Sequence, residues 1–148
     1  MKVNLEIESV DITGEKINTK NFAIMDIREF DFRLAYVEDL SGDGVKTRST
    51  LFVSPEELRI IRKGELNTDF MYGKNVVHNT NYITPYGAFP VTVTTLSYKY
   101  ELEGDLEDED IGFAIKVATT YTLQVGEDEL IKMSIKLCIT KAENVASM

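Results

Sequence analysis

Apolar and polar residues alternate along most of this chain, in runs separated by turn-forming residues. Val3, Leu5 and Ile7 alternate with charged or polar neighbours near the start. The odd positions from Ile111 to Val125, and again from Ile131 to Ile139, carry apolar, aromatic or β-branched residues. A period of two residues is typical of strands with one buried face. The pattern therefore predicts an all-β protein.

Short turns between these runs indicate antiparallel hairpins. Residues 21–27 and 30–38 are predicted to pair around a turn near Arg28-Glu29, and the Ser41-Gly42-Asp43-Gly44 turn leads into a strand over residues 45–53. The run from 111 to 125 would extend for roughly 50 Å, so it must coil and bend. We predict one domain, residues 1–148, folded as an antiparallel meander closed into a β-barrel, with a frayed tail over residues 141–148.

Residues 54–64 carry conflicting local signals. Ser54 with Glu57 forms a capping box and Pro55 suits a first helical turn, so a short helix is one interpretation. Leu58 and Ile60 alternate with polar neighbours, which favours a strand instead. We predict a turn at residues 54–57 and a hairpin closed at residues 63–64.

The strand pattern breaks at Thr84-Pro85-Tyr86-Gly87. Pro85 has no donor for a sheet ladder and Gly87 can adopt a positive φ, so we predict a turn at one end of the barrel. Tyr82 or Tyr86 is expected to face the barrel mouth.

Beyond that turn the apolar positions change phase. Leu96, Tyr98 and Tyr100 share one parity, whereas Val91 and Val93 have the other. One extra residue reverses which side of a strand faces the core, so a β-bulge is predicted near residues 94–95.

Charge and cysteine content exclude several classes of function. The formal net charge is −9, so the field of the molecule repels nucleic acid and anionic membrane surfaces. No apolar run has the length of a signal peptide or a transmembrane helix. Cys138 is the only cysteine, which rules out intrachain disulfides and favours a cytoplasmic protein. With one histidine and one cysteine, no metal or cofactor site of the usual soft ligands is expected.

Signatures of catalysis are missing from the sequence. There is no nucleophile elbow, no phosphate-cradling glycine loop and no dinucleotide fingerprint. His78 is best interpreted as a hydrogen-bonded structural residue. The acidic run over residues 104–110 lacks the ligand spacing of a calcium loop and is predicted to be a solvated turn. We expect a protein that is not an enzyme.

Several short motifs resemble those of a known family. They are Tyr36-Val37-Glu38, Arg62-Lys63-Gly64, Phe70-Met71-Tyr72-Gly73, Tyr82-Ile83-Thr84-Pro85-Tyr86-Gly87 and Thr94-Thr95. In this order they are similar to the uncharacterised bacterial YwiB-like proteins, small barrels of the lipocalin-like, or calycin, type. The resemblance covers nearly the whole chain and implies the fold. It implies no function, because that family has no assigned activity and a fold does not entail ligand carriage.

The residues themselves suggest two functions. In the first, the barrel binds a small apolar or amphipathic molecule, because tyrosines combine apolar rings with polar tips and an inward arginine needs a partner. The predicted lining is Tyr36, Arg62, Tyr82, Thr84, Tyr86 and Tyr121. We predict a cavity of at least about 300 Å³ beside these residues. The alternative for Arg62 is that it stacks on an aromatic ring or pairs with Glu38 to close one end of the barrel, and the tyrosines equally suit a solid core.

In the second function, the outer surface binds another protein or a second copy of the chain, as in a homodimer. Ile61, Val91 and Val93 motivate this hypothesis, because their parity is opposite to that of the inward set.

Overall fold

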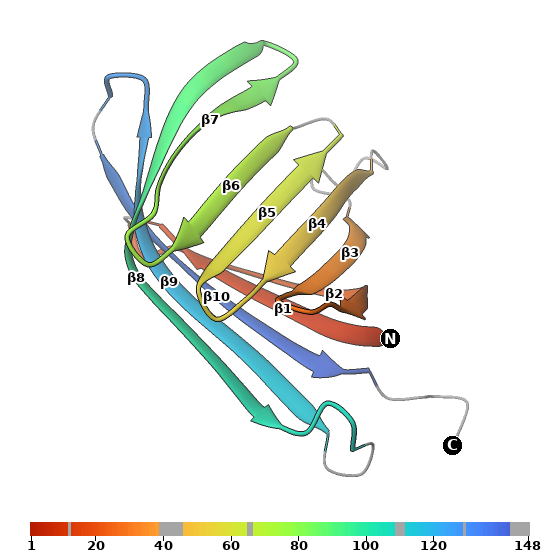
Figure 1. Cartoon of the computed structure of the whole chain (residues 1–148). Coiled ribbons are helices and arrows are strands. Elements are labelled where there is room, and N and C mark those ends of the chain that lie inside the picture. Colours follow the sequence, from red (N-terminus) through yellow and green to blue (C-terminus); the bar gives the residue numbers. More distant parts are fainter. Residues whose placement is uncertain (12, 39–45, 65–66, 109–111, 129, 143–148) are drawn as a thin grey trace.

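The computed structural model describes residues 1–148 except 12, 39–45, 65–66, 109–111, 129 and 143–148. This part of the chain consists of ten strands joined by turns, as Figure 1 shows. The strands are β1 (Lys2–Val10), β2 (Lys16–Ile27), β3 (Phe32–Glu38), β4 (Thr47–Val53), β5 (Glu57–Lys63), β6 (Thr68–Gly73), β7 (Val77–Thr84), β8 (Gly87–Gly104), β9 (Phe113–Val125) and β10 (Ile131–Lys141).

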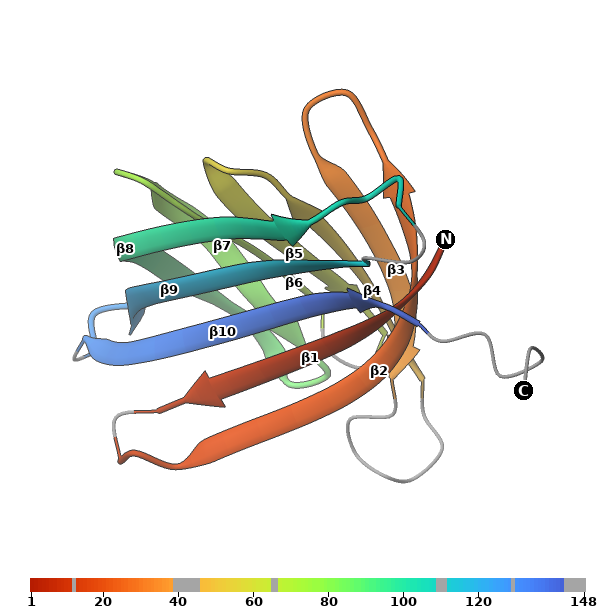
Figure 2. The same ribbon diagram turned by 90° about the horizontal axis from the view of Figure 1, so that it is seen from below.

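The strands form one antiparallel sheet that curls into a nearly closed barrel (Figures 1 and 2). The order is β6-β5-β4-β3-β2-β1-β10-β9-β8-β7, so each strand lies beside its neighbour in sequence. The one exception is the pairing of β1 with β10, which joins the first strand of the chain to the last. The predicted antiparallel meander and barrel are confirmed.

The barrel closes between β6 and β7, where the described backbone pairs only through a bridge between Asn67 and Ile83. Side chains supply other contacts across this seam. His78 Nε2 lies 2.9 Å from the carbonyl oxygen of Asp69, and the backbone N–H of Gly73 donates to Thr95 Oγ1 at 3.1 Å. The predicted hydrogen bonding of His78 is confirmed.

A bulge in β8 sets which residues face the core. The register of β8 on β9 shifts between Thr95 and Ser97. As a result Val91, Val93 and Tyr98 are all buried, whereas Leu96 is 54% exposed. The predicted bulge is confirmed. The placement of Leu96 inside and of Val91 and Val93 outside is wrong, because the extra residue lets both parities of the sequence reach the same face.

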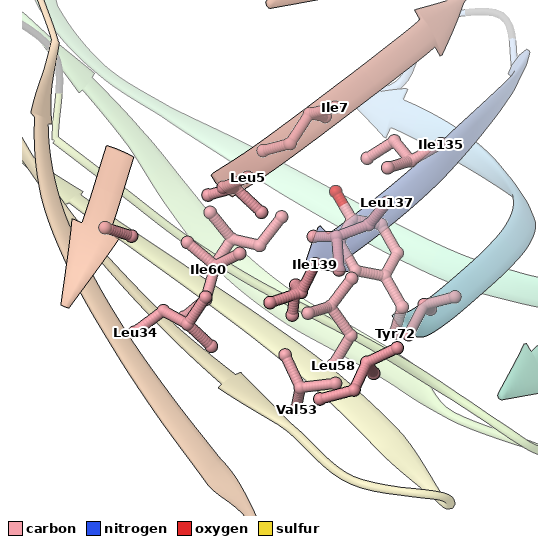
Figure 3. Packing of buried hydrophobic residues seen from close by; sticks show 14 of the residues in the cluster. Leu5, Ile7, Leu34, Val53, Leu58, Ile60, Tyr72, Ile135, Leu137 and Ile139 are labelled. Carbon is pink, nitrogen blue, oxygen red and sulfur yellow. The ribbon is translucent and has the colours of Figure 1, made fainter. Parts of the chain in front are cut away.

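Apolar side chains from both halves of the sheet pack together in the interior. Figure 3 shows Leu5 and Ile7 of β1 near Ile135, Leu137 and Ile139 of β10, with residues of β3 to β6 facing them. Alternation along each strand delivers these side chains inward.

The ambiguous segment at residues 54–64 forms a turn followed by β5. Ser54 Oγ accepts hydrogen bonds from the backbone N–H groups of Glu56 and Glu57, at 3.3 and 3.1 Å. The capping residue therefore closes a turn, and Leu58 and Ile60 enter the core from a strand.

Three expectations reach beyond the described residues, and the predicted turn at Ser41-Gly42-Asp43-Gly44 lies wholly outside them. Lys141 is the last residue of β10 and pairs with Val3, while 143–148 of the predicted frayed tail lie outside the described residues. Residues 109–110 of the acidic run also lie outside them.

Candidate functional site

A row of polar side chains crosses the inner face of β3 to β6. Tyr36 pairs with Ser49, Ser49 with Arg62, and Arg62 with Thr68. Cross-strand partners share one face of a sheet, and Tyr36, Ser49 and Thr68 are each at least nine-tenths buried, so the row faces the barrel interior. Two residues away along each strand, the next row on the same face is apolar: Leu34, Leu51, Ile60 and Phe70. We call Tyr36, Ser49, Arg62 and Thr68 the polar row.

Glu38 neutralises the cation of this row. Arg62 Nε lies 3.4 Å from Glu38 Oε1, and Ser49 Oγ donates to the same oxygen at 3.1 Å. The predicted pairing of Arg62 with Glu38 is confirmed. The Arg62 side chain is 26% exposed and that of Glu38 is 10% exposed. Within the described part of the chain, the terminal nitrogens of the guanidinium make no hydrogen bond, although solvent reaches the side chain.

Two hydroxyl groups of the polar row lack a hydrogen-bond partner in the part of the chain that the structure describes. The hydroxyls of Tyr36 and Thr68 are buried and unpaired among the described residues. Leaving a buried polar group unpaired costs about 1–3 kcal/mol, so such groups call for an explanation. A ligand atom that completes these bonds is one such explanation.

Burial raises the pKa of the Tyr36 hydroxyl, and the nearby charge of Glu38 adds to that effect. The charge of Arg62 and the polar groups of Ser49 and Arg62 near the hydroxyl lower the same pKa, as smaller opposing effects, although neither side chain meets the geometry of a hydrogen bond to it. The hydroxyl therefore stays protonated at neutral pH and can both donate and accept.

Tyr121 of β9 and Tyr72 of β6 contact each other in the core, within the electrostatic reach of Arg62. Their ring centroids are 4.7 Å apart, and the Tyr121 hydroxyl donates to Met133 Sδ at 3.8 Å. Burial raises the pKa of both hydroxyls, against a smaller lowering effect of the Arg62 charge. The charge of Arg62 thus acts on three inward tyrosines, of which Tyr36 and Tyr121 were predicted from the sequence.

Apolar side chains lie at the same end of the barrel interior as the polar row, because the hairpins after β3, β5, β7 and β9 all lie at one end of the antiparallel meander. Leu123 and Val125 continue the inner face of β9, as cross-strand partners of the buried Val93 and Val91. Leu123, Val125, Met133 and Tyr82 are only partly buried and pack against the core. We call these four residues the apolar wall. Together the row and the wall give this end of the interior one polar and one apolar side.

The remaining predicted residues lie on the β7–β8 hairpin. The bridge from Ile83 to Asn67 places the end of β7 beside the start of β6. Thr84 Oγ1 accepts a hydrogen bond from the backbone N–H of Tyr86 at 3.1 Å and so closes the predicted turn. Tyr86 is 94% exposed, so its side chain points into solvent. Of the two tyrosines expected at the mouth, Tyr82 is the one that packs against the core.

Sequence reasoning missed Ser49 and Thr68. A usable signal existed, because Ser49 shares its parity with Leu51 and Val53, and Thr68 shares its parity with Tyr72. A polar residue in phase with core residues on a strand marks either a buried hydrogen bond or a site.

Two grooves of about 900 and 540 Å³ occur elsewhere on the described surface. Both contact Glu6 and Cys138, cross-strand partners on the side of the sheet opposite to the buried Leu5 and Leu137. Burial raises the pKa of the Cys138 thiol, which makes it a poor nucleophile. Neither groove is lined by any of the six predicted residues, so a cavity beside them stays a prediction.

Metal-ligand clusters and membrane-spanning helices are both absent from the described residues. No three histidine, cysteine, aspartate or glutamate side chains are grouped in a way that could hold a metal ion. The same residues include no helix with the length and apolar character needed to cross a membrane.

Comparisons with known proteins extend over nearly the whole chain. The sequence model of the family described as Domain of unknown function (DUF1934) matches residues 2–137. No curated protein matches. Among solved structures, the crystal structure of ywiB protein from Bacillus subtilis is similar with a TM-score of 0.76 and 16% sequence identity, over 96% of this chain and 92% of that chain. At this identity the likeness shows the fold alone.

Proposed function

The chain belongs to the family described as Domain of unknown function (DUF1934), and we propose that it is a cytoplasmic, non-enzymatic protein that binds a small apolar or amphipathic molecule inside the barrel. The family match and the similarity to the ywiB structure confirm the resemblance to YwiB-like proteins. Neither carries an activity, so the proposal is supported by the interior of this chain.

The unpaired hydroxyls of Tyr36 and Thr68 are the observation that carries the proposal. Both are buried in one row with Arg62, whose guanidinium has free donors. A ligand with a polar head would complete these hydrogen bonds, and its apolar part would lie along the apolar wall. An amphipathic molecule therefore matches both sides of this end of the interior.

Of the six predicted residues, four line the proposed site in two roles, and the other two stand at its rim. Tyr36 and Arg62 contact the polar head, while Tyr82 and Tyr121 contact the apolar part. Thr84 and Tyr86 stand at the rim, on the hairpin of the same end, and meet the molecule only as it passes.

A reducing compartment is supported by the cysteine content. Cys138 is the only cysteine and is free, so the fold relies on its core and its sheet ladder alone.

Calorimetry with uncharged and charged amphiphiles of one chain length tests the proposal. We expect saturable binding to the wild-type protein, weakened about tenfold or more by Tyr36→Phe and by Thr68→Val, because each removes one hydrogen bond to the head. Tyr100→Phe is the matched control and should bind like the wild type, since Tyr100 packs against the core from β8 beyond the bulge. If no amphiphile binds, or if Tyr36→Phe and Thr68→Val both bind like the wild type, the proposal is wrong.

A second candidate function is self-association through the outer face of β2. Phe22 and Ile24 are 63% and 55% exposed there, and Val37 of β3 is 54% exposed. Of the residues that first motivated this function, only Ile61 remains outside the core. We expect a dimer in sedimentation velocity that Ile24→Lys converts to a monomer. A monomer at all concentrations of wild-type protein would contradict it.

A further inference from the structure

Together with Glu38, the polar row is electrically neutral before any ligand arrives. Arg62 carries one positive charge, and the carboxylate of Glu38 lies 3.4 Å away. Tyr36, Ser49 and Thr68 are uncharged, and burial favours the protonated form of Tyr36. Only 10% of the Glu38 side chain is exposed, so water screens this carboxylate weakly. The charge of Arg62 is therefore already compensated.

A charged head group would upset this balance. A carboxylate beside the row would bring a second negative charge close to Glu38 in a partly desolvated place, and two such charges repel each other. The field of the chain, with its net charge of −9, opposes an anion as well. An ammonium head would meet Arg62 and would lose hydration without gaining a free carboxylate.

The unpaired atoms of the row suit a head that both accepts and donates. The hydroxyls of Tyr36 and Thr68 can act in either role, and the free guanidinium nitrogens of Arg62 only donate. A hydroxyl group or a primary amide can accept from Arg62 and also donate to Thr68 or Tyr36. An ester or ether would leave the acceptors of the row unused.

We infer that the head group of the bound molecule is uncharged and both donates and accepts hydrogen bonds, as in a long-chain alcohol or a primary amide. This inference rests on the proposed function and narrows it. The barrel discriminates among amphiphiles by charge, and Glu38 is the residue that sets the preference by occupying the Arg62 cation.

The test compares four amphiphiles with one alkyl chain and different heads: a primary alcohol, a primary amide, a carboxylate and an amine. Calorimetry near neutral pH measures each affinity for the wild-type protein. We expect the alcohol and the amide to bind about tenfold or more tightly than the two charged molecules. A carboxylate that binds best would overturn the inference and leave the proposed function standing. If none of the four binds, the proposed function fails, and the inference fails with it.

Glu38→Gln tests the cause of the preference. The substitution keeps the shape and an acceptor for Ser49 but leaves Arg62 uncompensated, so the carboxylate should gain at least about tenfold in affinity relative to the alcohol. Glu103→Gln is the matched control, because it removes the same charge from an exposed pair with Lys116. An unchanged ranking in Glu38→Gln, with native secondary structure by circular dichroism, would overturn the role of Glu38. If that variant does not fold, the wild-type ranking of the four heads still decides the inference.

Discussion

The hydroxyl of Tyr98 donates a hydrogen bond to the backbone carbonyl oxygen of Ser54, and the two oxygens are 2.7 Å apart. Tyr98 lies on β8 just beyond the bulge, and Ser54 begins the turn between β4 and β5. Burial raises the pKa of Tyr98, so its hydroxyl remains a donor at all physiological pH values. The bulge thus directs Tyr98 inward to a carbonyl group that the turn leaves available.

Replacing Tyr98 with phenylalanine is expected to destabilise the protein by about 1–3 kcal/mol, because the substitution leaves a buried carbonyl oxygen without this donor. Urea denaturation followed by circular dichroism measures the free energy of unfolding. An unchanged midpoint would show that this hydrogen bond contributes nothing to stability.

Replacing Tyr36 with phenylalanine is not expected to lower the free energy of unfolding. The Tyr36 hydroxyl is buried without a partner, so Tyr36→Phe should leave the free energy of unfolding unchanged or raise it by up to about 1 kcal/mol when no ligand is present. Thr68→Val, which nearly preserves the side-chain shape, should behave alike. The measurement is the same urea denaturation, with Tyr98→Phe as the reference. A loss as large as that of Tyr98→Phe would mean that the Tyr36 hydroxyl finds a partner within the protein.

Alternation and turn residues predicted the fold, because apolar residues must recur at every second position of a strand that is buried on one face. The same rule failed at Val91 and Val93. A bulge reverses which alternate positions face the core, but the sequence does not show which set is inward on either side of it. The prediction assumed that Leu96 faces inward. Both valines are buried, so the assumption about Leu96 was wrong, because Leu96 is the residue that the bulge displaces.

The candidate site was predicted in part, for a related reason. Tyr36 and Arg62 were identified from parity, and the structure places both in the polar row. Tyr86 was chosen for its place beside Pro85 and Gly87, but a hairpin tip offers no inner face, and the side chain is 94% exposed. Which strands lie opposite one another across a barrel depends on register and shear, and neither can be read from one chain's alternation.

Replacing Gly87 with valine is expected to destabilise the protein by more than about 1 kcal/mol, because Gly87 has a φ of +140° that a β-branched residue rarely adopts. No atom lies within 4 Å of a Cβ built at this position, so the cost comes from the backbone alone. Thermal or urea denaturation reports the loss. Ala88→Val is the control, since Ala88 is exposed in the adjoining strand and should change stability by less than about 0.5 kcal/mol. Equal effects at the two positions would contradict the argument from φ.

The pair of Arg59 and Asp69 on the outer face of β5 and β6 should make stability depend on pH. Arg59 Nε and Nη2 donate to the two carboxylate oxygens of Asp69 at 2.9 and 2.7 Å. These hydrogen bonds lower the pKa of Asp69 below its usual value of 3.8. Because the pKa of Asp69 is lower in the folded state, the pair stabilises the folded protein above pH 3.8. This stabilisation is lost as the pH falls through the lower, folded-state pKa.

We therefore expect the difference in unfolding free energy between the wild type and Asp69→Asn to be constant above about pH 5 and to shrink toward lower pH. The difference should stay below about 1 kcal/mol, because the Arg59 and Asp69 side chains are 42% and 36% exposed. Urea denaturation between neutral and acid pH measures it. His78 contacts the backbone oxygen of Asp69, which the substitution retains, so the seam is left intact. In an Arg59→Gln background the pH dependence should vanish, and its persistence there would assign the effect to a group other than this pair.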